Sequence, residues 1–243
     1  MSTRRAAGLV LVLPLLLLAR AVLAIQLEPV LDSVVRVSTH LTVRDSENNE
    51  SIYVVQGSGW TSACKPEGEG YRVEVRTAAH VVDPAHTVEL TGMEEPWTLV
   101  GVSYELEYGD GSRYRLPAQA YRRGSDDSAV LQFRSRVRRP GLPAGDPRKI
   151  RPGDRLYTVA CPEGLRFLAC DGLFSNTLGQ AGLGPSLPPG WRESWWLSTL
   201  PVAPGSSGAP VLDENGQVVG QVVGRLEWPG GSFSILQPGE VKP

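Results

Sequence analysis

Short apolar runs, each closed by a glycine- or proline-rich turn signal, recur along the whole chain. Gly (27) and Pro (20) are abundant among the 243 residues, and long stretches with the apolar period of a helix are missing. Runs such as 34–38, 53–60 and 71–75 are rich in Val and Tyr, which favour strands. A chain of this length can form one large domain or two small ones that share a core. The pattern predicts an all-β protein.

One serine, Ser207, has an unusual setting among these turn signals. The segment 204–210 reads PGSSGAP and lies between apolar runs at 195–197 and 211–212. A hydroxyl is a poor nucleophile unless a base takes its proton and donors hold the oxyanion that forms. Flanking glycines allow a tight turn and leave N–H groups free to converge on one point. The same composition also suits an ordinary surface turn, so the residues that could assist Ser207 decide between the two.

Two such residues precede Ser207 in the chain. His80 closes the sequence RTAAH, and Asp127 lies in SDDSAVL, directly before an apolar run. Histidine can act as the general base and aspartate can orient it. The order His, Asp, Ser differs from that of subtilisins and of α/β-hydrolases. The three residues together therefore favour catalysis more strongly than any one of them alone.

Three of these short sequences, TAAH, DSAVL and GSSGAP, together resemble the signatures of chymotrypsin-fold serine proteases. The sequence GSGW at 57–60 and the strand-like run at 155–162 further resemble the protease domain of bacterial Deg/HtrA-type enzymes. The resemblance covers roughly residues 30–243. No PDZ module is expected to follow it.

The resemblance implies two six-stranded antiparallel β-barrels with the active site in the cleft between them. The first barrel is expected at about 30–138 and the second at 155–237. Between them, the linker 139–154 is rich in Pro, Gly and Arg and suits a boundary. An Asn-Gly sequence at 215–216 predicts a hairpin soon after the serine, whereas the nucleophile elbow of a hydrolase leads into a helix.

The resemblance also implies a catalytic role for each of four residues. His80 would be the general base, Asp127 its orienting partner and Ser207 the nucleophile. The N–H groups of Gly205 and Ser207 would form the oxyanion hole. Asp126 competes for the aspartate role, but the family signature places the aspartate two residues before the alanine, which selects Asp127. No cofactor is needed, and three histidines without paired His/Cys spacing make a metal site unexpected.

A substrate pocket is expected between the segment before the nucleophile and the strand after the hairpin. Its predicted walls are Thr199, Pro201, Val222, Val223 and Gly224. None of these residues is acidic, and a buried Lys or Arg side chain of a substrate would need a carboxylate partner. The pocket should therefore accept small or medium aliphatic side chains.

The first 24 residues have the pattern of a secretory signal peptide. Arg4 and Arg5 precede an apolar run at 8–19, and the sequence VLA at 22–24 suits cleavage. An uncleaved membrane anchor is the alternative, although the apolar run is short for a span of about 20 residues. The predicted location is secreted or periplasmic.

An oxidising compartment allows disulfides. Cys161 and Cys170 flank a short turn at 162–169, so a hairpin could bring them opposite each other. A disulfide is predicted between them, with Cys64 left free.

Protein or peptide substrates are the expected partners. The net charge of −2 gives no strong field for nucleic acid, and no stable membrane insertion is expected after signal cleavage. Two alternatives remain at this point. One is a protease-fold binding or chaperone module whose triad is not productively aligned, and the other is an esterase that uses the same triad. The sequence predicts no particular oligomeric state.

Overall fold

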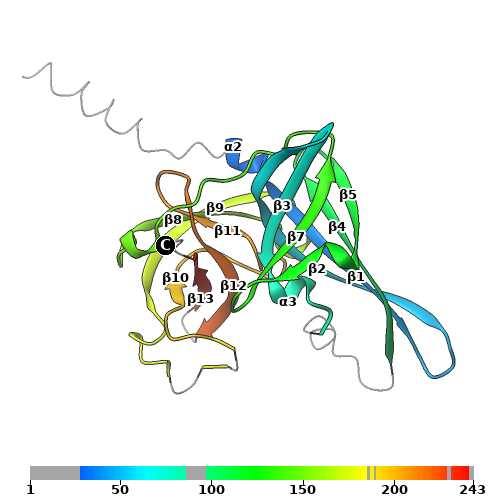
Figure 1. Ribbon diagram of the computed structural model, residues 1–243. Coiled ribbons are helices and arrows are strands. Elements are labelled where there is room, and N and C mark those ends of the chain that lie inside the picture. The colour runs from blue at the N-terminus through cyan, green and yellow to red at the C-terminus, as the bar shows by residue number, and fades with distance from the viewer. Residues whose placement is uncertain (1–27, 86–96, 185–186, 189, 229–230, 241–243) are drawn as a thin grey trace, which may run out of the picture.

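The computed structural model describes residues 28–85, 97–184, 187–188, 190–228 and 231–240. The predicted signal peptide lies outside this part of the chain. Among the helices that are described, none has the length and apolar character needed to cross a membrane. The described chain forms two β-structures that lie side by side, as Figure 1 shows.

The first half of the chain forms a curled, seven-stranded antiparallel sheet in the order β5-β4-β1-β2-β3-β7-β6 (Figure 1). Alternate residues of these strands, such as Val35, Val37, Val73 and Val75, point into one buried cluster. The strands are β1 (Val34–Arg44), β2 (Glu50–Glu67), β3 (Gly70–Ala78), β4 (Thr98–Tyr108), β5 (Arg113–Pro117), β6 (Tyr121–Arg123) and β7 (Ser128–Ser135).

The predicted all-β, two-barrel architecture is confirmed, although this sheet is a curled half-barrel of seven strands rather than a closed barrel of six. Among the described strands, β5 and β6 are its two edges, and they are joined by the chain through the 3-10 turn η1 (Ala118–Ala120) rather than by a ladder. Pro117 ends β5, and proline cannot donate a ladder hydrogen bond. Two short edge strands, of which β5 ends at a proline, therefore leave the described sheet curled but open.

The second half of the chain forms a closed six-stranded barrel in the order β10-β13-β12-β11-β8-β9. Its interior holds large apolar side chains, among them Leu156, Phe174, Trp196 and Leu236. The predicted Asn-Gly hairpin is confirmed, since it joins the two paired strands that follow Ser207. The strands are β8 (Arg155–Ala160), β9 (Leu168–Thr177), β10 (Trp196–Ser198), β11 (Pro210–Leu212), β12 (Val218–Trp228) and β13 (Gly231–Pro238).

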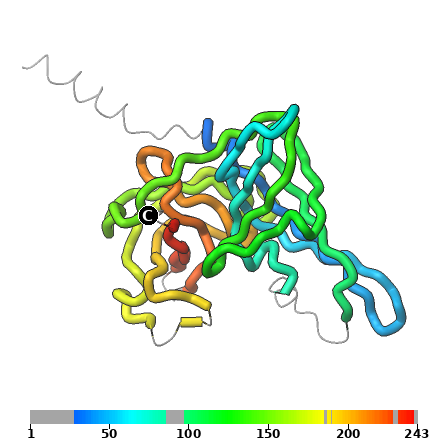
Figure 2. The backbone as a smooth tube through the Cα atoms, viewed as in Figure 1, coloured from blue at the N-terminus to red at the C-terminus, as the bar shows by residue number. Residues whose placement is uncertain are grey.

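Short helical turns and one long crossing segment connect these strands. The segment after β7, which contains η2 (Pro147–Lys149), passes from the sheet to the barrel, as the green tube in Figure 2 shows. Single helical turns α2 (Glu28–Leu31) and α3 (Ala79–Val82) belong to the first half, and η3 (Pro162–Gly164) joins β8 to β9. As a result, α3 and η3 lie where strands end, the usual place for functional residues.

The predicted disulfide between Cys161 and Cys170 is wrong, because all three cysteines are free. The register of β8 and β9 pairs Cys170 with Thr158, three residues before Cys161. Three strand residues span about 10 Å, and a disulfide needs Cα atoms within about 7 Å. The turn η3 and the left-handed backbone of Phe167 (φ 53°) precede β9, which begins only at Leu168, and this position sets the register.

Candidate active site

His80 is presented by α3, the single helical turn that follows β3. Ala79, Val81 and Val82 of this turn are buried in the core of the sheet, which leaves His80 half-buried at its surface. The hydroxyl of Thr39 donates to the Val81 carbonyl (2.6 Å), and the hydroxyl of Tyr104 donates to that of Val82 (3.1 Å). These bonds fix the turn, and therefore the origin of the His80 side chain.

The carboxylate of Asp127 binds His80 twice. Its Oδ2 lies 2.6 Å from His80 Nδ1, and its Oδ1 accepts the backbone N–H of His80 at 2.9 Å. A carboxylate on Nδ1 fixes the tautomer and leaves Nε2 as the nitrogen that can take a proton. Asp126 has φ 47° and pairs with Arg192 at 3.1 Å instead. The structure thus brings Asp127, and not Asp126, to His80.

Two buried glutamines of the barrel hold the backbone of Asp127. Gln221 Nε2 donates to the Asp127 carbonyl at 2.7 Å, and Gln237 Oε1 accepts the Asp127 N–H at 3.2 Å. Gln221 Nε2 also donates to Gln237 Oε1 at 3.2 Å. Neither glutamine was predicted from the sequence. The available signal was a lone amide in each of two apolar strands, since a buried amide needs a partner.

Two consecutive turns flank Ser207. In the first, the N–H of Ser206 donates to the Ala203 carbonyl (2.9 Å), and in the second, the N–H of Ala209 donates to the Ser206 carbonyl (2.9 Å). Gly205 (φ 93°) and Gly208 (φ 84°) adopt the left-handed backbone that these turns require. A Cβ on Gly205 would lie 2.6 Å from the Cys161 carbonyl oxygen, so only glycine fits there.

The N–H groups of Gly205 and Ser207 donate to no acceptor within the described part of the chain. The Pro204 carbonyl, by contrast, accepts the N–H of Glu163 at 2.7 Å. In a trans peptide the N–H points opposite to the C=O, so the Gly205 N–H is directed away from Glu163. Two unengaged N–H groups on either side of one residue suit the binding of an oxyanion.

Ser207 lies against the segments that carry His80. The backbone N–H of Ser58 donates to the Ser207 carbonyl (2.8 Å). Gly57 lies between this carbonyl and the side chain of Val81, next to His80. A Cβ on Gly57 would lie 2.9 Å from Ser207 O and 2.7 Å from both Val81 methyl groups, so there is no room for a side chain between them. Between Ser207 Oγ and His80 the described residues show no hydrogen bond. In free enzymes this bond often tightens only when substrate binds.

The five predicted pocket residues lie on the barrel, but their exposure differs. Thr199 and Pro201 are exposed, Val222 is buried in the barrel core, and Val223 packs against the cluster that contains Trp195. Gly224 faces the indole of Trp191, which a Cβ on Gly224 would meet at 3.4 Å. Their role in binding a substrate side chain stays a prediction.

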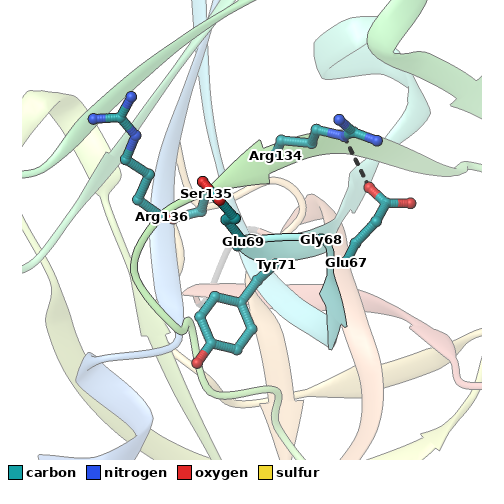
Figure 3. Close-up of a pocket in the computed structure, with 8 residues that line it drawn as sticks. Glu67, Gly68, Glu69, Tyr71, Arg134, Ser135 and Arg136 are labelled. Atoms are coloured by element: carbon teal, nitrogen blue, oxygen red, sulfur yellow. Dashed lines mark hydrogen bonds and ion pairs between the residues drawn. The ribbon is translucent and has the colours of Figure 1, made fainter.

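A separate hollow lies at the opposite end of β3 from His80, at the tip of the β2–β3 hairpin (Figure 3). Arg134 Nε donates to Glu67 Oε2 at 2.9 Å across it. Of the other side chains drawn there, Glu69 and Arg136 are exposed, Tyr71 is half-buried and Ser135 is buried. We assign this hollow no function.

Comparisons with known proteins bear on the family and the fold of this chain. A family model for the trypsin-like peptidase domain matches residues 57–220. A search of curated proteins finds no match. Solved structures that match include a variant of the HtrA-type protease AlgW with a decapeptide, at TM-score 0.61 and 19% identity, covering 85% of this chain and 60% of that one. Another is AlgW with a tripeptide, at TM-score 0.55 and 20% identity, covering 83% and 56%. The chain therefore spans about 60% of the length of these proteins, and such low identities support the fold alone.

Proposed function

Because the chain belongs to the trypsin-like peptidase family, we propose that this protease is a serine endopeptidase that uses His80, Asp127 and Ser207. The observation that carries the proposal is the double contact of Asp127 with His80, at 2.6 Å and 2.9 Å. This His80–Asp127 pair lies beside Ser207. The N–H groups of Ser207 and Gly205 donate to no acceptor within the described chain. Peptides and proteins are the proposed substrates.

The proposed reaction has two halves. Ser207 Oγ attacks the carbonyl carbon of the scissile bond while His80 Nε2 takes the hydroxyl proton, and the N–H groups of Gly205 and Ser207 hold the resulting oxyanion. Collapse breaks the C–N bond, and the leaving amine takes the proton from His80. Water then attacks the acyl-enzyme with His80 again as base, and the acid product leaves with Ser207 restored.

Two finer proposals follow from the sequence. Thr199, Pro201, Val222, Val223 and Gly224 contribute no carboxylate, so the residue before the scissile bond should be small or medium and aliphatic. A peptide library varied at that position tests this, and a preference for Lys or Arg would contradict it.

The leader at residues 1–24 supports export to a secreted or periplasmic location, which N-terminal sequencing of the expressed protein would test.

A fluorophosphonate probe tests the proposed activity, because it reacts with a serine hydroxyl only when a base activates it. We expect the wild-type protein to be labelled on Ser207 and to digest casein. The Ser207→Ala variant, as the matched control, should do neither.

A non-catalytic binding module is a second candidate, favoured by the lack of a Ser207–His80 hydrogen bond among the described residues. Binding of an unfolded polypeptide without labelling or cleavage would support this candidate against the protease. Hydrolysis of small esters without cleavage of any peptide would instead indicate an esterase with the same triad.

A further inference from the structure

Ser58, on β2 of the sheet, is fully buried, and its polar atoms are bonded to both halves of the molecule. Its Oγ accepts the N–H of Cys161 at 2.9 Å and donates to the Gly205 carbonyl at 2.7 Å. Its backbone N–H donates to the Ser207 carbonyl at 2.8 Å, and its own carbonyl accepts the Thr77 hydroxyl at 2.7 Å. One residue of the sheet thus binds two residues of the serine segment.

The two backbone bonds of Ser58 could be made by any residue, but the hydroxyl bridge could not. Without the hydroxyl, the buried Cys161 N–H would be left unpaired, and the partly buried Gly205 carbonyl would lose its protein partner. The bridge joins the turn η3 to the segment that carries the two unengaged N–H groups. The hydroxyl is therefore the part of Ser58 that requires an explanation.

The peptide planes on both sides of Gly205 are held from outside the serine segment. The plane before it is fixed through the Pro204 carbonyl, which accepts the N–H of Glu163 from η3 (2.7 Å). The plane after it is fixed through the Gly205 carbonyl, which accepts the Ser58 hydroxyl. The Gly205 N–H lies in the first plane, and the second plane also carries the Ser206 N–H, which donates to the Ala203 carbonyl (2.9 Å). Because Gly205 has the conformational freedom of glycine at φ 93°, fixing the second plane limits the rotation that could turn the first.

We propose that Ser58 is a positioning residue whose hydroxyl locks the Gly205–Ser206 peptide and so helps to keep the Gly205 N–H, in the preceding peptide, aimed at the oxyanion, an inference that rests on the proposed protease function. The lock comes from the sheet, while the locked segment belongs to the barrel. Through Ser58, the correct geometry of the oxyanion hole therefore depends on the contact between the two halves.

The test compares the full-length Ser58→Ala variant with the wild type and with Ser62→Ala. Ser62 is a matched control because it also lies on β2 and donates to a backbone carbonyl, that of Glu74, at 3.2 Å, away from the serine segment. We expect Ser58→Ala to lower kcat by about 10- to 100-fold, less than the 10²–10³ that loss of a whole oxyanion donor costs. KM should change less than threefold, and Ser62→Ala should retain wild-type kcat.

The affinity of a peptide boronate distinguishes a positioning role from a purely structural one, because the bound boronate places an oxygen in the oxyanion hole. Its affinity should fall by the same factor as kcat/KM in Ser58→Ala. The affinity of an uncleaved peptide, measured on the Ser207→Ala background with and without Ser58→Ala, should not change. If Ser58→Ala folds poorly, Ser58→Cys keeps a weak donor and should show the same loss to a smaller extent.

The outcomes separate this proposal from the one it rests on. An active wild type together with a Ser58→Ala variant that is less stable but has unchanged kcat and boronate affinity would overturn the positioning role and leave the protease function intact. A wild type that neither reacts with the fluorophosphonate nor cleaves peptides would overturn the protease function, and this proposal with it.

Discussion

At the scale of single residues, two adjacent carboxylates have different surroundings. Asp127 binds both the ring and the backbone of His80, whereas Asp126, one position earlier, takes a left-handed backbone and pairs with Arg192. The backbone reversal at Asp126 directs the two side chains apart. The short-range signature that selected Asp127 was therefore sufficient, because the distinction is made within two residues of chain.

Asp127→Asn should lower kcat by about 10⁴-fold, because an amide cannot hold the same tautomer of His80. Asp126→Asn keeps an oxygen for Arg192 and should stay within about twofold of the wild type. Peptide hydrolysis by the two variants at matched fold content is the measurement. Loss of activity in the Asp126 variant alone would show that the aspartate has been assigned to the wrong residue.

Gly205→Ala should lower kcat by at least about 10²-fold, because the new methyl group meets the Cys161 carbonyl and displaces the oxyanion donor. Gly182→Ala is the control: Gly182 has φ 78°, and a Cβ there meets nothing within 4 Å. Both variants carry the backbone strain of about 1–3 kcal/mol, and only the first carries the clash. Thermal unfolding and kcat measured together separate the two effects, and equal losses of kcat would contradict the explanation.

At the scale of elements, the features that could be predicted from the sequence are those set by residues close together in the chain. The hairpin at Asn215-Gly216 and the strand pattern are local, and the structure has both. The pairing of Cys161 with Cys170 instead depended on the register of β8 against β9, which η3 and Phe167 shift. The β2–β3 connection is equally local, because β2 continues to Glu67 and only a tight turn separates it from β3 at Gly70.

The thiols offer a test of this register. Reduction should leave the melting temperature and activity of the mature protein unchanged, because Cys161 and Cys170 are free. Burial raises the pKa of the Cys161 thiol, so less thiolate is present at pH 8 than for an ordinary cysteine. Alkylation of Cys161 in the folded protein should therefore be slow at pH 8 and quicken as the pH rises toward that pKa. Mass spectrometry without reduction that found Cys161 linked to Cys170 would contradict this expectation.

At the scale of the whole molecule, the candidate site depends on the contact between sheet and barrel. His80 and Asp127 come from the sheet, and Ser207 comes from the barrel. Ser58 joins the halves on the serine side, and Gln221 and Gln237 join them at Asp127. The sequence signal for these three residues, a polar side chain in an apolar strand, shows that each has a partner but does not say which one, so their roles could not be predicted.

The glutamine pair gives a quantitative test of that contact. Gln237→Met leaves the Asp127 N–H without its partner, whereas after Gln221→Met the Asp127 carbonyl still accepts the N–H of Ala79 at 2.9 Å. Removing one partner of a buried hydrogen bond costs about 1–3 kcal/mol, so Gln237→Met should be the more destabilising change.

The two glutamines also bond each other, at 3.2 Å, so the loss of this one bond counts in both single variants but only once in the double variant. The double variant should therefore be destabilised by less than the sum of the singles, with a coupling of at least about 0.5 kcal/mol. Urea unfolding of the four proteins measures this coupling. Additive losses would show that the pair does not act as one unit, and the tie at Asp127 would then rest on Gln237 and Gln221 separately.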